Sequence, residues 1–420
     1  MHPGARSGKA VAAAAEPLAR ATVAETKLGN VPDKTTKNQM ASLGVYRSLA
    51  GRPGRGVLQT FSDRQVTEIG SPAGVIFALI PMTNPVATAV FKTLIALKGG
   101  NALILSFHRA ALQVGNEVGA LIRTVLTAAG APPDLVQWIP KRTSRKKTAM
   151  FLSHPGVSLV LATGGSAMVK AAYSSGTPAI GVGPANTPTL ICADADPDQA
   201  AQAVVLSKSF DNGLICGAEH NLIVERPLRE ALVAAFERAG AAVLNEEETR
   251  RLLKTAVDPE TKGWRGQIVG QSAEAIAGFM KITRGYPIRL IVAPTEDAAP
   301  HNPLAGEKIF PVLSLFTVED AEAGITLARR LLEAHGAGHT AGIHTRNPAL
   351  IERFGRLVPA GRILVNSPSV QGVVGLTSRL DPSFTLGCGT FGGNSTTDNV
   401  SFRHLLNIKR VAHVMPPLNA

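Results

Sequence analysis

Residues 74–105, GVIFALIPMTNPVATAVFKTLIALKGGNALIL, decide the fold of this 420-residue chain. Residues 75–80 are apolar throughout, residues 86–97 form an apolar segment of helical length, and residues 102–105 are apolar again. Strands that are apolar along their whole length and separated by helices are typical of parallel sheets covered on both faces. The stretch therefore predicts an α/β fold.

The same alternation continues along most of the chain. Further helices are expected at 112–128, 199–207, 228–239, 246–256 and 321–334, and further strands at 135–139, 157–162, 221–225, 289–293, 312–316 and 363–365. The first 50 residues are mostly helical, and residues 56–69 predict a hairpin with so little apolar content that it must pack against something, such as another subunit. Ligands of parallel sheets bind at the carboxyl ends of the strands, so the site is expected there.

The composition excludes several classes of protein. Cys192, Cys216 and Cys388 are the three cysteines, too few for a disulfide framework, and they fit a reducing, cytoplasmic location. No apolar run is long enough to cross a bilayer, and no signal peptide is visible. The net charge of +12 and the basic run KRTSRKK at 141–147 allow an anionic ligand such as a nucleotide or coenzyme A, or simply a solvated loop. With 5% aromatic residues, nucleic-acid binding is not expected.

The segment 209–217, SFDNGLICG, presents Cys216 between a helix and a strand. The thiolate is the reactive form of cysteine, and backbone N–H groups near the sulfur would favour it. The alternative is a small buried hydrophobic residue, which describes most free cysteines.

Three glycine-rich turns accompany this segment: ATGGS at 162–166, GVGP at 181–184 and GCGTFGGNS at 387–395. The first leaves a strand and opens a helix, where close backbone approach and the helix N-terminus favour a phosphate. An ordinary strand-to-helix turn is the alternative. The third is so dense in glycine that we expect the backbone to wrap closely around something.

Together these motifs resemble the CoA-acylating aldehyde dehydrogenases, which include the aldehyde dehydrogenase half of bifunctional aldehyde–alcohol dehydrogenases. The resemblance covers residues 30–410. It rests on PMTNP at 81–85, ATGG at 162–165, VKAAY at 169–173, GVGP at 181–184, FDNGLIC at 210–216, GHT at 338–340, NSP at 366–368 and the segment 385–395.

The resemblance implies a Rossmann-like coenzyme-binding domain at 1–55 and 72–208 and an α/β catalytic domain at 209–399. It also implies a small oligomerisation element at 56–71 and 400–420, within a homodimer or homotetramer. NAD or NADP would be the coenzyme and coenzyme A the co-substrate. The implied reaction interconverts a short-chain aldehyde and its acyl-CoA thioester.

The resemblance also assigns the site residues. Cys216 would be the nucleophile, Asn84 would donate with the Cys216 backbone N–H to the oxyanion, and His339 would act as acid–base. The residues implied in coenzyme binding are Thr163, Gly164, Gly165, Ser166, Gly181, Gly183 and Glu307. Asn84 could instead cap the helix that follows it.

Two departures from the family pattern and three alternative functions stay open at this point. The glutamate that activates water in hydrolytic aldehyde dehydrogenases is replaced by Gly181, which favours transfer to coenzyme A over release of acid. An anionic aldehyde such as sulfoacetaldehyde, a hydrolytic dehydrogenase and a non-catalytic member remain alternatives. The lysine that often holds the adenine ribose is absent from Ser106-Phe107-His108. His339 with His335 and His344 could suggest a metal site, but the intervening glycines argue against the necessary helix, so no metal is expected.

Overall fold

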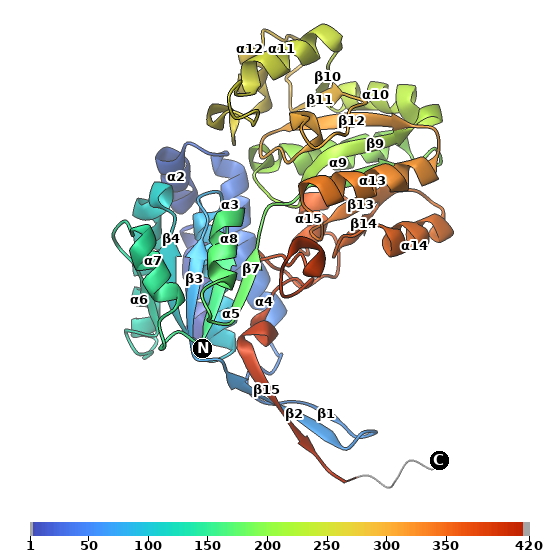
Figure 1. Cartoon of the computed structure of the whole chain (residues 1–420). Helices are drawn as coiled ribbons and strands as arrows, with labels where there is room; N and C mark the ends of the chain where they lie inside the picture. Colours follow the sequence, from blue (N-terminus) through green and yellow to red (C-terminus); the bar gives the residue numbers. More distant parts are fainter. Residues whose placement is uncertain (1–2, 415–420) are drawn as a thin grey trace.

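Residues 3–414 are described in the structure, which is a computed structural model (Figure 1). Figure 1 shows two lobes, each with helices around a sheet, and a narrow arm of strands that extends away from them. Both lobe sheets are parallel, so the α/β fold class is confirmed. None of the helices within residues 3–414 combines the length and apolar character needed to cross a membrane.

The first lobe contains a five-stranded parallel sheet. Its order is β5 (Val136–Trp138), β4 (Ala102–Phe107), β3 (Val75–Ile80), β6 (Leu159–Thr163) and β7 (Ala179–Val182). One face packs against α5 (Pro85–Lys98), α6 (Leu112–Ala128) and the N-terminal helices α1 (Pro3–Ala13), α2 (Ala15–Thr26), α3 (Val31–Gln39) and α4 (Val45–Leu49). The other face packs against α7 (Arg145–Leu152) and α8 (Ser166–Tyr173).

The strand order reverses direction between β3 and β6, and this is where open parallel sheets form a ligand crevice. Helix α5 starts directly beside it, with Pro85 as its first residue, a position at which proline needs no backbone N–H. In the middle of α5, buried Lys92 donates to the carbonyls of Leu79 (2.8 Å) and Leu161 (2.9 Å), which ties the helix to β3 and β6. These hydrogen bonds hold α5 against the two strands that flank the crevice.

The second lobe contains a seven-stranded parallel sheet. Its order is β10 (Ala241–Val243), β11 (Leu290–Pro294), β12 (Val312–Val318), β9 (Glu219–Glu225), β8 (Thr187–Ile191), β13 (Ala341–His344) and β14 (Ile363–Val365). Helices α9 (Pro197–Ser209) and α10 (Arg229–Arg238) cover one face. The other face carries α13 (Ala321–His335) and α14 (Pro348–Leu357), with α11 (Glu246–Ala256) and α12 (Ala273–Phe279) toward β10 and β11. The short α15 (Ser369–Val373) follows β14.

The arm is a three-stranded antiparallel sheet of β1 (Gly56–Phe61), β2 (Val66–Pro72) and β15 (Leu406–Ala412). The predicted hairpin is thus present, and the C-terminal strand pairs with it from Leu406 opposite Pro72 to Ala412 opposite Val66. Val57 and Val411 are 59% and 44% exposed, so the arm keeps apolar side chains at its surface.

The domain boundary expected after residue 208 differs from the boundary between the sheets. Strand β8 and helix α9 lie before that residue, yet β8 pairs with β9 and β13 of the second sheet. The chain therefore passes from the first sheet to the second between Val182 and Thr187. The prediction missed β8 because its sequence, TPTLI, contains a proline and two threonines in place of a continuous apolar run.

Candidate active site

Cys216 lies in a sharp turn between α9 and β9, and residues 210–216 are called the cysteine loop below. A short 3₁₀ turn, Phe210–Gly213, opens the loop, and the N–H of Ala218 donates to the Ile215 carbonyl (3.0 Å) beyond the cysteine. Asp211, Asn212 and Gly213 have φ values of 47°, 54° and 72°. A Cβ at Gly213 would lie 2.8 Å from the Phe310 backbone, so only glycine allows this close approach.

The structure brings His339 into contact with the cysteine. His339 Nε2 lies 3.2 Å from Cys216 Sγ, and His339 Nδ1 lies 2.8 Å from Thr340 Oγ1. Gly338, with φ of 94°, fixes the histidine in place, since a Cβ there would lie 1.8 Å from the Cys388 carbonyl oxygen. The glycine-rich segment 387–395 therefore packs closely against the segment before β13 that carries His339.

Burial favours the neutral form of both partners of this contact. Burial, with a contribution from the charge of Glu307, raises the pKa of the Cys216 thiol to about 12, although Arg362 and the cysteine's own N–H oppose the shift. Burial, followed by Arg362, holds the pKa of His339 well below its usual value. The cysteine's own N–H favours the thiolate, as expected, but desolvation outweighs this effect in this conformation. A thiol next to a neutral imidazole can still pass its proton to Nε2 as it attacks an electrophile.

Asn84 lies at the carboxyl end of β3, at the N-cap position of α5. Its side chain makes no capping hydrogen bond, so the alternative role of helix cap applies only to its backbone. Its Oδ1 accepts a hydrogen bond from Lys37 Nζ, and its Nδ2 lies 3.3 Å from Thr83 Oγ1. With Oδ1 occupied by a donor, the amide presents its N–H groups as donors, which an oxyanion requires.

A buried ion cluster, which sequence reasoning missed, links Asn84 to the cysteine loop. Fully buried Asp211 accepts from Lys34 Nζ (3.0 Å), from Lys37 Nζ and from the Asn30 N–H (3.0 Å). Lys34 also donates to the Thr83 carbonyl (3.0 Å), and burial followed by repulsion from Lys37 lowers its pKa to about 8. Because Lys34 and Lys37 lie three residues apart on a short polar helix, they resemble an exposed face in the sequence.

Arg362 is a second residue that the sequence did not indicate. Its guanidinium is buried, donates to the carbonyls of His339 (2.7 Å) and Thr397 (2.8 Å), and also contacts the Gly387 carbonyl. Burial lowers its pKa, although the thiols of Cys388 and Cys216 act in the opposite direction. Arg362 thus fixes the His339 backbone and places a positive charge near the nucleophile.

The turn Thr163–Ser166 lies at the carboxyl edge of the first sheet. Thr163 ends β6, Gly165 is the N-cap of α8, and no side chain caps the free N–H groups of that helix. A Cβ at Gly165 would meet nothing within 4 Å, so space is open above the turn. Unpaired N–H groups at a helix N-terminus beside open space fit the diphosphate of a dinucleotide.

The other three residues implied in coenzyme binding differ from one another. Gly181 lies in β7, where a Cβ would lie 2.8 Å from both Tyr173 and Val169, so packing explains this glycine. Gly183 has open space around it. Glu307 is largely buried, accepts from the Ala185 N–H (3.2 Å), and has its pKa raised by burial.

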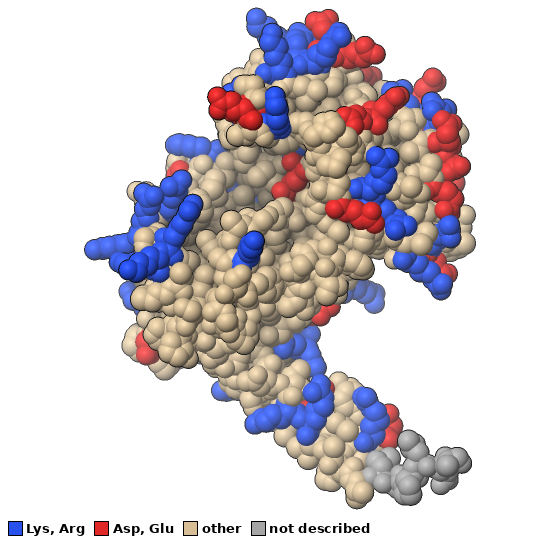
Figure 2. Space-filling model, viewed as in Figure 1, with Lys and Arg blue, Asp and Glu red and all other residues tan. Residues whose placement is uncertain are grey.

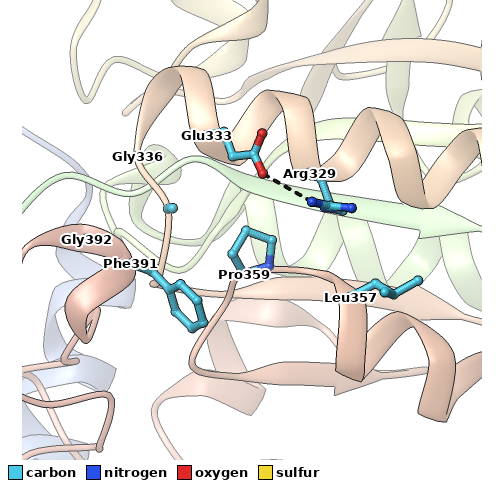
Figure 3. Close-up of a pocket in the computed structure, with 8 residues that line it drawn as sticks. Arg329, Glu333, Gly336, Leu357, Pro359, Phe391 and Gly392 are labelled. Atoms are coloured by element: carbon cyan, nitrogen blue, oxygen red, sulfur yellow. Dashed lines mark ion pairs between the residues drawn. The ribbon is translucent and has the colours of Figure 1, made fainter.

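Within residues 3–414, no group of three or more His, Cys, Asp or Glu side chains is placed to hold a metal ion. A cavity of about 640 Å³ lies beside the C-terminal end of α13 (Figure 3). It is lined by Arg329, Glu333, Gly336, Ala337, Leu357, Pro359, Phe391 and Gly392. Neither Cys216 nor His339 lines it, so this cavity is not the reaction site.

The chain matches the aldehyde dehydrogenase family over residues 6–377. It is 39% identical over 403 residues to aldehyde-alcohol dehydrogenase 2 of Entamoeba histolytica, which covers 94% of this chain and 46% of that protein. It is 38% identical over 408 residues to an acylating sulfoacetaldehyde dehydrogenase of Cupriavidus necator, covering 94% and 80%. The chain spans about half the length of the bifunctional relatives that it matches.

Solved structures agree with this assignment. The crystal structure of an acetylating aldehyde dehydrogenase from Geobacillus thermoglucosidasius superposes with a TM-score of 0.94 at 38% identity, covering 100% of this chain and 92% of that one. A propionaldehyde dehydrogenase from Rhodopseudomonas palustris, solved with bound CoA and an acylated cysteine, superposes with a TM-score of 0.88 at 28% identity, covering 98% and 92%. The chain belongs to the aldehyde dehydrogenase family.

Proposed function

We propose that this chain is a CoA-acylating aldehyde dehydrogenase, which interconverts a short-chain aldehyde, coenzyme A and NAD(P)+ with the acyl-CoA and NAD(P)H. The observation that carries the proposal is the 3.2 Å contact between Cys216 Sγ and His339 Nε2. A nucleophile paired with a base is the arrangement that forms and cleaves thioesters. The first lobe would bind the coenzyme and the second would carry the chemistry.

In the first half-reaction, Cys216 Sγ attacks the aldehyde carbon while His339 Nε2 takes the thiol proton. The resulting oxyanion lies where the Cys216 N–H and the Asn84 amide can donate to it, and removal of one such donor costs about 2.7–4 kcal/mol. Bound NAD(P)+ supplies the acceptor for the hydride that leaves this carbon, and a thioester on Cys216 remains. Thr163–Ser166 would hold the diphosphate and Glu307 the nicotinamide ribose.

Before the second half-reaction, His339 releases the first proton to solvent. It then takes the proton from coenzyme A, whose sulfur attacks the thioester, and Cys216 leaves as the thiolate and regains a proton from His339 Nε2. Water competes poorly because the place of the hydrolytic glutamate is occupied by Gly181, where Tyr173 and Val169 leave no room for a side chain. The similarity to a propionaldehyde dehydrogenase that binds CoA with an acylated cysteine supports the same sequence of steps.

A single-turnover experiment tests the proposal. Mixing the enzyme with acetaldehyde and NAD+ or NADP+ should give a burst of reduced coenzyme that stops near one per active site, and coenzyme A should restart it. Steady production of reduced coenzyme without coenzyme A would make the protein a hydrolytic dehydrogenase. Absence of any burst, with Cys216 alkylated normally by iodoacetamide, would favour a non-catalytic member.

An anionic aldehyde is the second candidate substrate. The similarity to an acylating sulfoacetaldehyde dehydrogenase, together with a net charge of +12, favours it. A panel of acetaldehyde, propionaldehyde and sulfoacetaldehyde, scored by kcat/KM, decides between the two classes.

The arm supports a proposal of self-association as a homodimer or homotetramer. Its exposed Val57 and Val411 belong to a sheet that has few other apolar contacts, and burial against a second copy would cover them. Light scattering of the wild type and of a Val57→Lys, Val411→Lys variant tests this.

All three cysteines are free, which suits a cytoplasmic location.

A further inference from the structure

We propose that the basic segment 141–147 forms a subsite for a phosphate on the ribose of an adenine coenzyme. That phosphate is the 2′-phosphate of NADP or the 3′-phosphate of coenzyme A. The inference rests on the proposed function, and it names the part of the coenzymes that this chain selects. It gives a role to a charged run that the catalytic mechanism leaves unused.

The segment lies at the same edge of the first sheet as the diphosphate turn. It follows β5, whose last residue, Trp138, pairs with Leu105 of β4. Asn116 on α6 fixes its beginning, since it accepts from Trp138 Nε1 (2.9 Å) and donates to the Pro140 carbonyl (3.2 Å). The basic side chains therefore project from an anchored base at the carboxyl edge, where parallel sheets bind ligands.

Helix α7 begins within the segment, at Arg145, and covers the same face of the sheet as α8, the helix that would bind the diphosphate. Leu152 of α7 and Ala172 of α8 belong to one apolar cluster on the same face of the sheet, together with Phe77. Both helices begin at the carboxyl edge. Strands β6 and β5 are separated by β3 and β4, so they lie about 14 Å apart at about 4.8 Å per strand. This span suits an adenosine whose diphosphate lies at α8 and whose ribose phosphate lies at α7.

The charge of the segment is uncompensated. Its five cations are Lys141, Arg142, Arg145, Lys146 and Lys147, and all are exposed. Within residues 3–414, none of these side chains takes part in an ion pair. Arg109, exposed at the end of β4 on the same edge, adds a sixth cation. Figure 2 shows the resulting group of blue side chains at the left of the first lobe, where Figure 1 places α7.

The position of these charges is unfavourable for the helix itself. Three of the cations occupy the first turn of α7, which contains no acidic residue. The N-terminus of a helix carries a partial positive charge, so cations there destabilise it, whereas an anion stabilises it. A bound phosphomonoester, with nearly two negative charges at neutral pH, would reverse this effect and would accept several hydrogen bonds from the lysines and the arginine forks.

The segment would discriminate between coenzymes that are otherwise identical. The diphosphate is common to NAD, NADP, coenzyme A and dephospho-CoA, so α8 cannot distinguish them. The ribose phosphate is the group that separates each pair, and only a charged subsite beyond the diphosphate can detect it. An NAD-specific site with a carboxylate toward the ribose hydroxyls would repel that phosphate.

Two measurements test the inference, one of which needs no turnover. Calorimetric binding of 2′,5′-ADP and 3′,5′-ADP is compared with that of 5′-ADP, and kcat/KM is compared for NADP+ against NAD+ and for coenzyme A against dephospho-CoA. We expect at least one of the two phosphorylated ligands to be preferred by about tenfold or more, the equivalent of about 1.4 kcal/mol. The preferred isomer identifies which coenzyme supplies the phosphate. The preference should weaken as salt rises from 0.05 to 0.5 M, because the cations are exposed.

The variant for this test carries glutamine at all five positions of the segment, which keeps side-chain length and helix propensity. It should lose the preference and keep its activity with the unphosphorylated coenzymes. The matched control carries glutamine at five exposed basic residues of the second lobe: Arg250, Lys254, Lys262, Lys281 and Arg289. Equal binding of all three nucleotides by the wild type, or an unchanged preference in the five-glutamine variant, would overturn the inference. If no aldehyde is oxidised at all, the proposed function fails, but the binding experiment still decides whether the segment 141–147 binds a ribose phosphate.

Discussion

Replacing His339 with glutamine should slow formation of the acyl-enzyme itself, and not only its release. The side chain of glutamine can place an amide near Cys216 Sγ but cannot accept a proton. In the structure, His339 Nε2 lies 3.2 Å from that sulfur, and the histidine is fully buried between Arg362 and the glycine-rich segment. It is therefore positioned to serve the first half-reaction as well as the second.

The magnitude follows from the protonation state of the thiol. With a thiol pKa of about 12, only about one molecule in 10⁵ holds a thiolate at pH 7. Forming the free thiolate would cost about 7 kcal/mol, at about 1.36 kcal/mol per pKa unit. A general base that removes the proton during attack typically contributes about 10²–10⁴-fold. His339→Gln should therefore reduce the rate of the burst by about that factor.

Stopped-flow absorbance with aldehyde and NAD(P)+ measures the burst, and addition of coenzyme A gives the steady state. We expect the burst rate and the steady-state rate of His339→Gln to fall together, while the burst amplitude stays near one per site. Cys192→Ala, a change in a buried cysteine outside the site, serves as a control for the effect of substitution in the second lobe. A burst within about threefold of the wild-type rate, combined with a much lower steady state, would refute the reasoning. It would confine His339 to deprotonation of coenzyme A.

Three further predictions test other parts of the site. Lys37→Met should lower kcat/KM by about 10–100-fold with little change in coenzyme affinity, because the Asn84 amide loses the lysine that orients it. The loss should not exceed that expected for removal of one oxyanion donor. An unchanged kcat would show that Asn84 needs no such support. The rate at which iodoacetamide alkylates Cys216, measured by peptide mass spectrometry, should rise about tenfold per pH unit from pH 7 to 9, since the thiol pKa is about 12. A plateau of that rate within this range would contradict the neutral thiol. Gly338→Ala should destabilise the protein by several kcal/mol in thermal denaturation, because its Cβ would lie 1.8 Å from a carbonyl oxygen. The control Gly355→Ala, on an open part of α14, should be neutral or stabilising by about 1 kcal/mol. Equal effects of the two substitutions would refute the steric argument.

The elements that were predicted well are those whose pattern is local. The apolar run 75–80 and the helix 112–128 coincide with β3 and α6, since burial on both faces or on one stripe leaves a clear periodicity. Strand β8 and the short β13 were missed, because proline, threonine or glycine interrupts the apolar run in each of them. A central strand tolerates these residues because neighbouring strands pair with it on both sides. Because β8 was missed, the predicted boundary between the lobes falls after residue 208 and not between Val182 and Thr187.

The site divides in a similar way. Cys216 and His339 could be proposed because each lies in a motif, but their contact joins residues 123 positions apart and depends on the approach of Gly338 to Cys388. Lys37 and Arg362 lie in no motif that a single sequence reveals, and the motif that contains Asp211 does not indicate its buried lysine partners. Their importance comes from burial, which turns ordinary charged residues into fixed partners and is invisible until distant segments are placed together.

The structure also explains why one substitution would not convert the proposed thiol transfer into hydrolysis. A base for water would have to stand at position 181, but a side chain there would meet the ring of Tyr173 and a methyl group of Val169, both on α8. Tyr173 is itself held by the Gly181 N–H (2.9 Å) and by the N–H of Ser395 in the glycine-rich segment (3.0 Å). Glu307 does not replace the missing base, because its carboxylate is bound to the Ala185 N–H and lies in the field of two buried lysines. The lack of room for a carboxylate at position 181 thus follows from how β7 packs under α8, and its reversal would require both elements to be rebuilt.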